Sequence, residues 1–167
     1  MTTTYQNLVL PGKPTATKTI LWATLISGSL DALAGVIVYL SLFGYNPFQV
    51  LQSIAEGIYG PAAFKGGLLT VSAGLVLHYF IAFVVSVIFF YAYPKIKILS
   101  KYNVASGLLF GAAIWLVMNL VVVPLSNIPA TPFNPLLAFI GISWHMVLVG
   151  LPIALITKAF YTSTENK

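Results

Sequence analysis

Residues 67–93, GLLTVSAGLVLHYFIAFVVSVIFFYAY, decide the fold of this chain. The stretch contains no Lys, Arg, Asp or Glu. At 1.5 Å per residue, a helix of this length crosses a hydrocarbon core of about 30 Å. A long apolar run without two-residue alternation satisfies its backbone hydrogen bonds as a helix rather than as part of a barrel. The stretch therefore predicts a transmembrane helix.

The composition extends this prediction to the whole chain. Of 167 residues, 59% are hydrophobic and 7% are charged, whereas about a quarter of residues in soluble domains are charged. Three further apolar stretches are long enough to span a membrane, at residues 20–43, 104–123 and 136–160. We predict an all-α integral membrane protein, a four-helix bundle in which residues 1–167 form one domain.

The first span could be mistaken for a signal peptide, because Ala32, Leu33 and Ala34 imitate a peptidase site. Asp31 precedes them directly, however, and the apolar run continues to Phe43, so we expect this span to be retained. The chain has no cysteine, which excludes disulfides, thiolate metal sites and covalent c-type haem attachment.

The lysines predict the orientation in the membrane. With an even number of spans, one side receives seven of the eight basic residues, and Lys65 alone falls on the other. The seven are Lys13, Lys18, Lys95, Lys97, Lys101, Lys158 and Lys167. By the positive-inside rule both termini face the cytoplasm. We expect these lysines to meet anionic lipid headgroups, and no nucleic acid partner, because no aromatic stacking platform accompanies them.

The connectors also carry signals. Asn46 and Pro47 are typical of a helix start, and residues 47–57 predict a short outer interfacial helix that ends near Gly57. Its expected apolar face holds Phe48, Leu51, Ala55, Ile58 and Tyr59. The charge-free PLSNIPATPFNP, residues 124–135, favours a stiff extended cap. The expected aromatic belt on the inner side consists of Trp22, Tyr91, Tyr93, Tyr102 and Tyr161.

A weak internal repeat predicts two similar helical hairpins. A shift of 67 positions places Gly74 and His78 on Gly141 and His145. Ser27-Gly28 and Ser106-Gly107 are a fainter echo in the first and third spans. A duplicated hairpin would bring the two histidines to similar depth on facing helices.

Counting residues from the outer ends of the spans gives the same depth independently. His78 is 11 residues from Gly67, His145 is 9 from Leu136, and Asp31 is 12 from Phe43. All three should lie within about 5 Å of one another along the membrane normal. We therefore predict an intramembrane polar site of Asp31, His78, His145 and Asn119. The residues expected to line it are Ser27, Gly74, Trp115, Gly141, Trp144 and Pro152.

Several functions suit such a site. A titratable acid and two histidines at mid-membrane, beside a proline-containing helix, favour proton-linked or ion and small-solute transport or channel activity. Four spans make a small scaffold, so this interpretation includes a homo-oligomer. Alternatively, His78 and His145 are axial ligands of a b-type haem, with Gly74 and Gly141 making room for the porphyrin face.

Two other interpretations use the same residues. His78, His145 and Asp31 have the donor atoms of a transition-metal centre. In the last interpretation the protein is a structural or accessory membrane protein, whose buried polar residues only fix helix packing. The chain contains no nucleophile motif, zincin HExxH or phosphate-binding glycine loop, which argues against an enzyme.

The segments GSLDALAG, AFKGG, YPKIK, WLVMNLVVVPLS and PFN are spread over nearly the full chain. In these segments the sequence resembles small four-span bacterial inner-membrane proteins to which no function is assigned. The resemblance implies a multi-pass protein of the bacterial inner (cytoplasmic) membrane with a four-helix architecture. It implies no catalytic residue.

Overall fold

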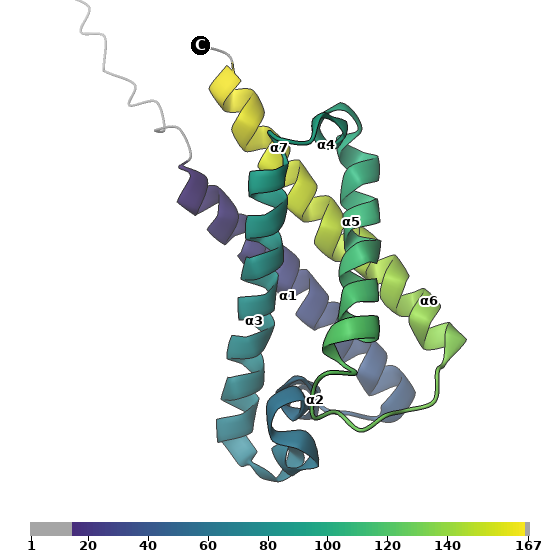
Figure 1. The fold of residues 1–167 in the computed structure, drawn as a ribbon. Coiled ribbons are helices and arrows are strands. Elements are labelled where there is room, and N and C mark those ends of the chain that lie inside the picture. The colour runs from purple at the N-terminus through teal and green to yellow at the C-terminus, as the bar shows by residue number, and fades with distance from the viewer. Residues whose placement is uncertain (1–14, 166–167) are drawn as a thin grey trace, which may run out of the picture.

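The computed structural model describes residues 15–165, and these residues form helices joined by short connectors (Figure 1). No strand occurs among them. In chain order the elements are α1 (Ala16–Phe43), α2 (Pro47–Tyr59), η1 (Gly60–Lys65), α3 (Gly67–Ala92), α4 (Lys97–Lys101), α5 (Asn103–Val117), η2 (Met118–Val122), α6 (Pro135–Trp144), η3 (His145–Gly150) and α7 (Leu151–Glu165).

The predicted all-α bundle with four spans is confirmed. Four helical stretches are long and apolar enough to cross a membrane: Ala16–Phe43, Gly67–Ala92, Asn103–Val122 and Pro135–Ser163. The last of these consists of α6, η3 and most of α7, which continue one another. In Figure 1, α3 and α5 stand upright, and α1 and the α6–α7 stretch slant behind them.

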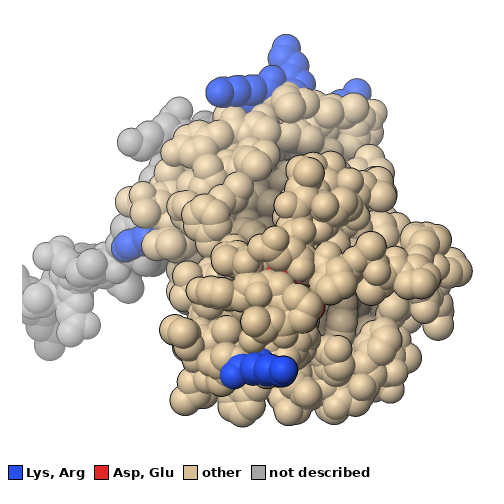
Figure 2. Space-filling view, turned by 60° about the horizontal axis from the view of Figure 1, so that its bottom comes forward, with Lys and Arg blue, Asp and Glu red and all other residues tan. Residues whose placement is uncertain are grey.

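The two ends of the bundle differ. One end, the α2 end, holds α2, η1 and the connector of residues 123–134 (Figure 1). The other, the α4 end, holds α4, the start of α1 and the end of α7. Lys65 closes η1 at the α2 end, and the remaining lysines that the structure describes belong to the α4 end. Lys13 and Lys167 lie outside the described residues. Figure 2 looks at the α2 end and shows one isolated basic side chain near its centre line, with the others at the rim.

Local signals fix the helix ends. The Thr15 hydroxyl caps α1 by accepting from the Lys18 amide at 3.3 Å, and Gly44 ends that helix with a φ of 71°. Asn46 and Gln49 form the capping box that starts α2 at Pro47, as predicted. This helix runs to Tyr59 rather than ending near Gly57, because the residue in the left-handed region that breaks it is Gly60, with a φ of 60°.

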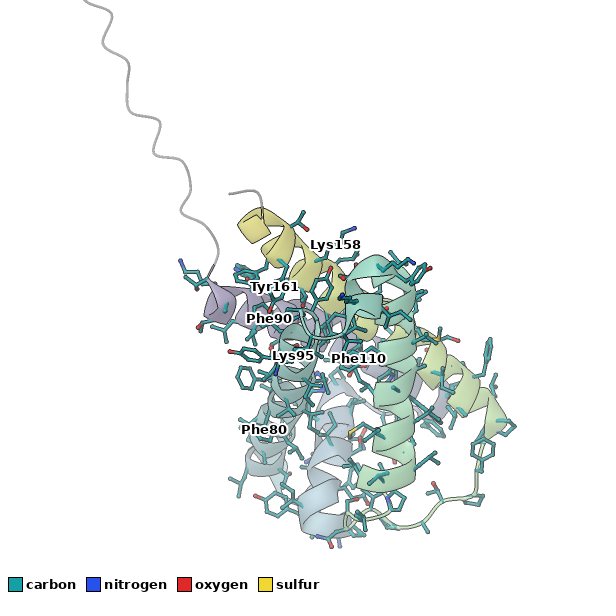
Figure 3. All side chains as sticks on the ribbon, turned by 45° about the horizontal axis from the view of Figure 1, so that its top comes forward. Phe80, Phe90, Lys95, Phe110, Lys158 and Tyr161 are labelled. Carbon is teal, nitrogen blue, oxygen red and sulfur yellow. The ribbon has the colours of Figure 1, made fainter. Side chains whose placement is uncertain are left out.

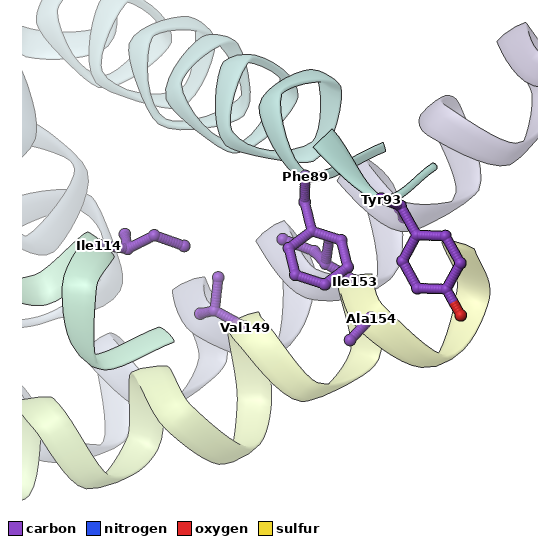
Figure 4. Packing of buried hydrophobic residues seen from close by; sticks show 7 residues of the cluster. Phe89, Tyr93, Ile114, Val149, Ile153 and Ala154 are labelled. Carbon is purple, nitrogen blue, oxygen red and sulfur yellow. The ribbon is translucent and has the colours of Figure 1, made fainter. Parts of the chain in front are cut away.

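The hydrophobic core lies between the helices toward the α4 end (Figure 4). Phe89 of α3 and Ile153 and Ala154 of α7 are at most 1% exposed, and Ala23 of α1 is 2% exposed. The other members of this cluster are Tyr93, Ile114 and Val149. All the spans therefore contribute to one core, and the large apolar side chains outside it are left on the bundle surface, where lipid is expected.

One tyrosine predicted for the interfacial belt instead packs inside the α4 end. Tyr93 is 6% exposed, and its ring stacks on that of Tyr161 with centroids 5.2 Å apart. The Tyr161 hydroxyl donates to the Phe90 carbonyl at 3.1 Å, and Figure 3 shows these two residues next to each other. The belt prediction was wrong for Tyr93, because aromatic stacking was available inside, whereas Tyr161 is only partly buried. Trp22, Tyr91 and Tyr102 are exposed.

Glycines bring α5 and the fourth span into backbone contact. A Cβ atom on Gly111 would overlap the carbonyl of His145, and a Cβ atom on Gly150 would overlap the carbonyl of Gly107. Only glycine permits this approach, which is how close-packed membrane helices use GxxxG spacing. The α5–η3 seam, made by Gly107, Gly111 and Gly150, holds His145 in place.

Both η2 and η3 are π-helical turns. In η3 the Leu151 amide bonds to the Met146 carbonyl, five residues back, and in η2 the Val123 amide bonds to the Met118 carbonyl at 2.8 Å. Pro152 is the second residue after η3 and has no amide hydrogen for the Leu148 carbonyl. The turn before this proline is π-helical, and its first residue is His145.

The α2 helix packs into the bundle against α3. A Cβ atom on Gly74 would overlap the carbonyl of Leu51, and the Gln52 amide donates to the Gly67 carbonyl and the Thr70 hydroxyl at 3.4 and 3.3 Å. Gln52 is 7% exposed, whereas Ile58 and Tyr59 of the predicted apolar face are exposed. The Gln52 side of α2 therefore faces α3, which offers it hydrogen-bond partners, and the interfacial role of the apolar face stays a prediction.

Candidate functional site

Three ionisable side chains from three elements meet inside the bundle. Asp31 of α1 lies between His78 of α3 and His145 at the start of η3. Its Oδ2 atom is 4.0 Å from His78 Nδ1, and its Oδ1 atom is 3.7 Å from His145 Nε2. These are the residues that the depth count placed at one level. Their side chains are 22%, 10% and 14% exposed in the order Asp31, His78, His145, so the group is largely shielded.

Backbone carbonyls fix the tautomer of each histidine. His78 Nε2 lies 2.8 Å from the Gly28 carbonyl, and His145 Nδ1 lies 2.8 Å from the Gly141 carbonyl. A carbonyl oxygen only accepts hydrogen bonds, so each of these ring nitrogens carries a hydrogen. In the neutral histidines, the nitrogens that face Asp31 then hold lone pairs.

The cluster is therefore short of hydrogen-bond donors. The Trp144 indole Nε1 donates to Asp31 Oδ1 at 2.9 Å. Against this one donor stand two carboxylate oxygens and two imidazole lone pairs. Lone pairs that face a carboxylate repel it, most strongly where water is scarce. Addition of a proton to one imidazole would convert this repulsion into an ion pair.

The cluster forms part of the wall of a cavity of about 260 Å³. Aliphatic side chains dominate the rest of the wall, and they come from several helices: Val36, Val50, Leu51, Ile54, Ile81, Val85, Ile114, Val123 and Val149. This volume is slightly below the range of about 300 to 1,000 Å³ usual for small-molecule sites. Figure 2 shows that the molecular surface is hollowed at the α2 end, with small traces of acidic residues visible between the other residues.

Ser27 and Trp144 line the cavity as predicted, and Asn119 does so without joining the ionisable cluster. Asn119 is exposed, and its side-chain amide donates to the Trp115 carbonyl of its own helix at 2.9 Å. Pro152 is not among the lining residues and acts on the site through η3. The role of the predicted set in function stays a prediction.

The glycines beside the histidines serve a different purpose from the one expected. The space at Gly74 is filled by the backbone of α2, as described above, and the space at Gly141 is filled by the Trp115 indole, whose Nε1 atom a Cβ would overlap. Neither glycine leaves room for a porphyrin face. Trp115 and these glycines are therefore packing residues, and the expectation that they line the site was wrong.

The arrangement does not support the haem and metal interpretations. The Asp31 carboxylate faces both imidazole nitrogens that are free of carbonyl contacts, so it takes the position that haem iron would need between them. Within residues 15–165, no group of three His, Asp or Glu side chains is arranged to hold a metal ion. The proposed ligand set of His78, His145 and Asp31 is thus assembled as an ion-pair cluster.

The glycines of the fainter echo meet different neighbours. A Cβ atom on Gly28 would lie 3.0 Å from the Tyr79 ring, and a Cβ atom on Gly107 would lie 2.7 Å from the Ala154 methyl. The hairpins differ at the site, since Phe110 takes the position after Gly107 that Asp31 takes after Gly28. A duplication stays a prediction.

Sequence reasoning missed two parts of the site. Trp144 was expected to line it but not to donate to Asp31, and no spacing rule joins residues so far apart in the chain. The α2 residues of the wall, Val50, Leu51, Ser53 and Ile54, were assigned to an interfacial helix. Their signal was Gly74, a glycine in the middle of a span, which indicates close approach of another backbone.

Comparisons with protein-family models, curated proteins and solved structures find no match for this chain.

Proposed function

We propose that this multi-pass membrane protein transports a small solute in a proton-linked cycle, with Asp31, His78 and His145 as the proton-binding group. One observation carries the proposal: a carboxylate and two imidazole lone pairs face one another in the wall of a cavity inside the spans. Intramembrane ionisable groups of this kind are typical of proton and ion pathways.

The energetics favour a site that changes its protonation. A charged side chain at the bilayer centre costs at least about 2.5 to 3.5 kcal/mol, so an unpaired Asp31 carboxylate is unfavourable. Protonation of one histidine gives a site of zero net charge. Histidine exchanges protons readily near neutral pH. Loss of that proton to one side of the membrane restores the negative charge of the site. A solute bound in the cavity can then contribute to the charge of the site.

The π turns supply a means of coupling. His145 begins η3, and Asn119 lies in η2, so both π turns border the cavity. A π turn holds one more residue than the α-helix around it, and its conversion to α-helix rotates the residues on one side relative to the other. Such a change at η3 would move His145 relative to Asp31 and link proton binding to the shape of the cavity.

We place the protein in the bacterial inner membrane with both termini in the cytoplasm. The uneven lysine distribution supports this orientation, because Lys95, Lys97 and Lys101 belong to the α4 end and Lys65 to the α2 end. The lysines of the α4 end would contact anionic lipid headgroups. A homo-oligomer is part of the proposal, because four spans enclose only a small cavity.

Reconstituted proteoliposomes with a trapped pH-sensitive dye test the proposal. Small amines, monovalent ions and neutral solutes are added outside one at a time, and the internal pH is followed. We expect at least one solute to change the internal pH with the wild-type protein and not with Asp31→Asn. Glu56→Gln is the matched control, because Glu56 is an acid of α2 that does not line the cavity.

The control should behave as wild type. If no solute changes the internal pH with the wild-type protein, or if Asp31→Asn responds as the wild type does, the proposal is wrong.

A further inference from the structure

We infer that the solute is a primary or secondary ammonium ion with a small apolar body, and that it competes with protons for the Asp31 cluster. The inference rests on the proposed function for its role in transport, but the binding it describes can be measured without transport. It follows from the hydrogen-bond inventory of the cavity wall.

Four polar side chains of the wall other than the histidines donate within the protein, and Tyr39 adds a hydroxyl that can donate or accept. The Ser27 hydroxyl donates to the Ala23 carbonyl at 2.7 Å, and the Ser53 hydroxyl donates to the Val50 carbonyl at 2.8 Å. Asn119 gives an amide hydrogen to the Trp115 carbonyl, and Trp144 gives its indole hydrogen to Asp31. What these side chains can still offer a guest is mostly acceptor atoms.

The ionisable groups add to this excess of acceptors. With the tautomers fixed by Gly28 and Gly141, neutral His78 and His145 present lone pairs. Asp31 presents its carboxylate, and Lys is not found among the described residues of the wall. A ligand with hydrogen-bond donors and a positive charge can pair with these acceptors. An anion, in contrast, is repelled by the carboxylate and has no lysine to bind.

The spacing suits one ammonium group. Asp31 is 4.0 Å from His78 Nδ1 and 3.7 Å from His145 Nε2, too far for direct hydrogen bonds. A primary ammonium has three N–H bonds, and the cluster has three acceptors: the carboxylate and two imidazole nitrogens. The aliphatic remainder of the wall then accommodates the apolar body of the guest.

Protons and the ammonium ion use the same lone pairs, so they exclude each other. In the inferred exchange, the site without a guest holds one proton on a histidine nitrogen that faces Asp31. When the ammonium enters, that proton leaves to solvent, and the charge of the cavity stays the same. No covalent bond other than this N–H bond is broken.

Few other ionisable groups face the cluster. His78 faces it from α3 and His145 from η3, and the neutral Trp144 donates to it from α6. Tyr39 of α1 lines the same cavity, whereas Glu56 of α2 does not. The described part of α5 and α7 contributes no acid or base to the wall.

Three probes that share a benzyl group test the inference on the full chain in detergent. Isothermal titration calorimetry measures binding of benzylammonium, of benzyltrimethylammonium, which has the charge without N–H donors, and of benzyl alcohol, which has no charge. We expect benzylammonium to bind at least about tenfold more tightly than the other two, because charge-assisted hydrogen bonds are the strong ones. Binding should weaken as the pH falls, and titrations in buffers of different ionisation enthalpy should show release of a proton.

Two variants and one control complete the test. Asp31→Asn should reduce benzylammonium affinity at least about tenfold, and Glu56→Gln should leave it unchanged. If Asp31→Asn fails to fold, Ser53→Leu narrows the cavity away from the cluster and should weaken binding likewise. Equal affinity for benzylammonium and benzyltrimethylammonium, or affinity that does not depend on pH, overturns the inference.

The outcomes separate the two proposals. Benzylammonium binding that depends on Asp31 and on pH, without coupled flux in proteoliposomes, supports the binding inference and overturns transport. Proton-coupled flux of a solute that lacks N–H donors, without benzylammonium binding, supports transport and overturns the inference.

Discussion

The Trp144 indole donates a 2.9 Å hydrogen bond to Asp31 Oδ1 across 113 positions of sequence. This contact joins the fourth span to the first at the ionisable cluster. A neutral donor of this kind stabilises the charged carboxylate without adding a second charge. Trp144 and His145 are neighbours in the chain and face the same oxygen atom, at 2.9 and 3.7 Å, but only the indole donates a hydrogen bond to it.

Trp144→Phe should lower the free energy of unfolding by about 1.5 to 3 kcal/mol, because it removes a hydrogen bond to a charged group while keeping an aromatic ring. Chemical denaturation in detergent measures the loss. The same change in an Asp31→Asn background should cost clearly less, since the charged acceptor is gone. Equal losses in both backgrounds would show that the indole acts by packing alone.

Gly111→Ala should destabilise the protein by about 1 to 3 kcal/mol, because the added methyl overlaps the His145 carbonyl and forces α5 away from η3. Gly35→Ala is the control. Its methyl would meet only one described atom, Val50 Cγ1 at 4.0 Å, so its melting temperature should stay near that of the wild type. A Gly111→Ala protein with wild-type melting temperature would contradict the backbone contact.

Pro152→Ala should convert η3 toward regular α-helix, because residue 152 regains an amide hydrogen for the Leu148 carbonyl. Hydrogen–deuterium exchange read by mass spectrometry should show increased protection in residues 145–150. Exchange in η2 should not change, since Pro124, which follows that π turn at the same two-residue distance, is left in place. Unchanged exchange in residues 145–150 would mean that the π turn depends on the α5–η3 seam and not on the proline.

The orientation can be tested by labelling single cysteines, since the chain has none of its own. Ser100 lies in α4 and Thr131 in the connector at the opposite end, and both are exposed. With both termini in the cytoplasm, a membrane-impermeant maleimide should label Thr131→Cys in spheroplasts. Ser100→Cys should react only after the membrane is opened. The reverse pattern would invert the proposed orientation.

The sequence was sufficient to predict the spans and the depth of the ionisable residues in the membrane. Hydropathy over the length of a bilayer depends on composition alone, and a regular rise per residue turns a count into a height. Asp31, His78 and His145 could therefore be placed at one level without knowledge of the helix contacts. Their hydrogen bonds could not, because these depend on how each helix is rotated.

Other features needed the coordinates. A glycine such as Gly74 or Gly141 signals a close neighbour but does not identify it, and here the neighbours are a backbone and an indole ring. The burial of Gln52 could not be predicted, because its partners on α3 are set by tertiary packing. The π turns leave no trace in the hydrophobic pattern, since both faces of these spans are apolar.

The α5–η3 seam has a consequence for how this protein can change over generations. Gly107, Gly111 and Gly150 already have the smallest side chain that exists, so any substitution there can only add atoms. Substitutions at these positions can therefore only enlarge the side chain. The membrane-facing positions of the same helices, in contrast, can exchange one aliphatic residue for another. Natural variants should accumulate on the outer surface of the helices and be rare along this line of contact.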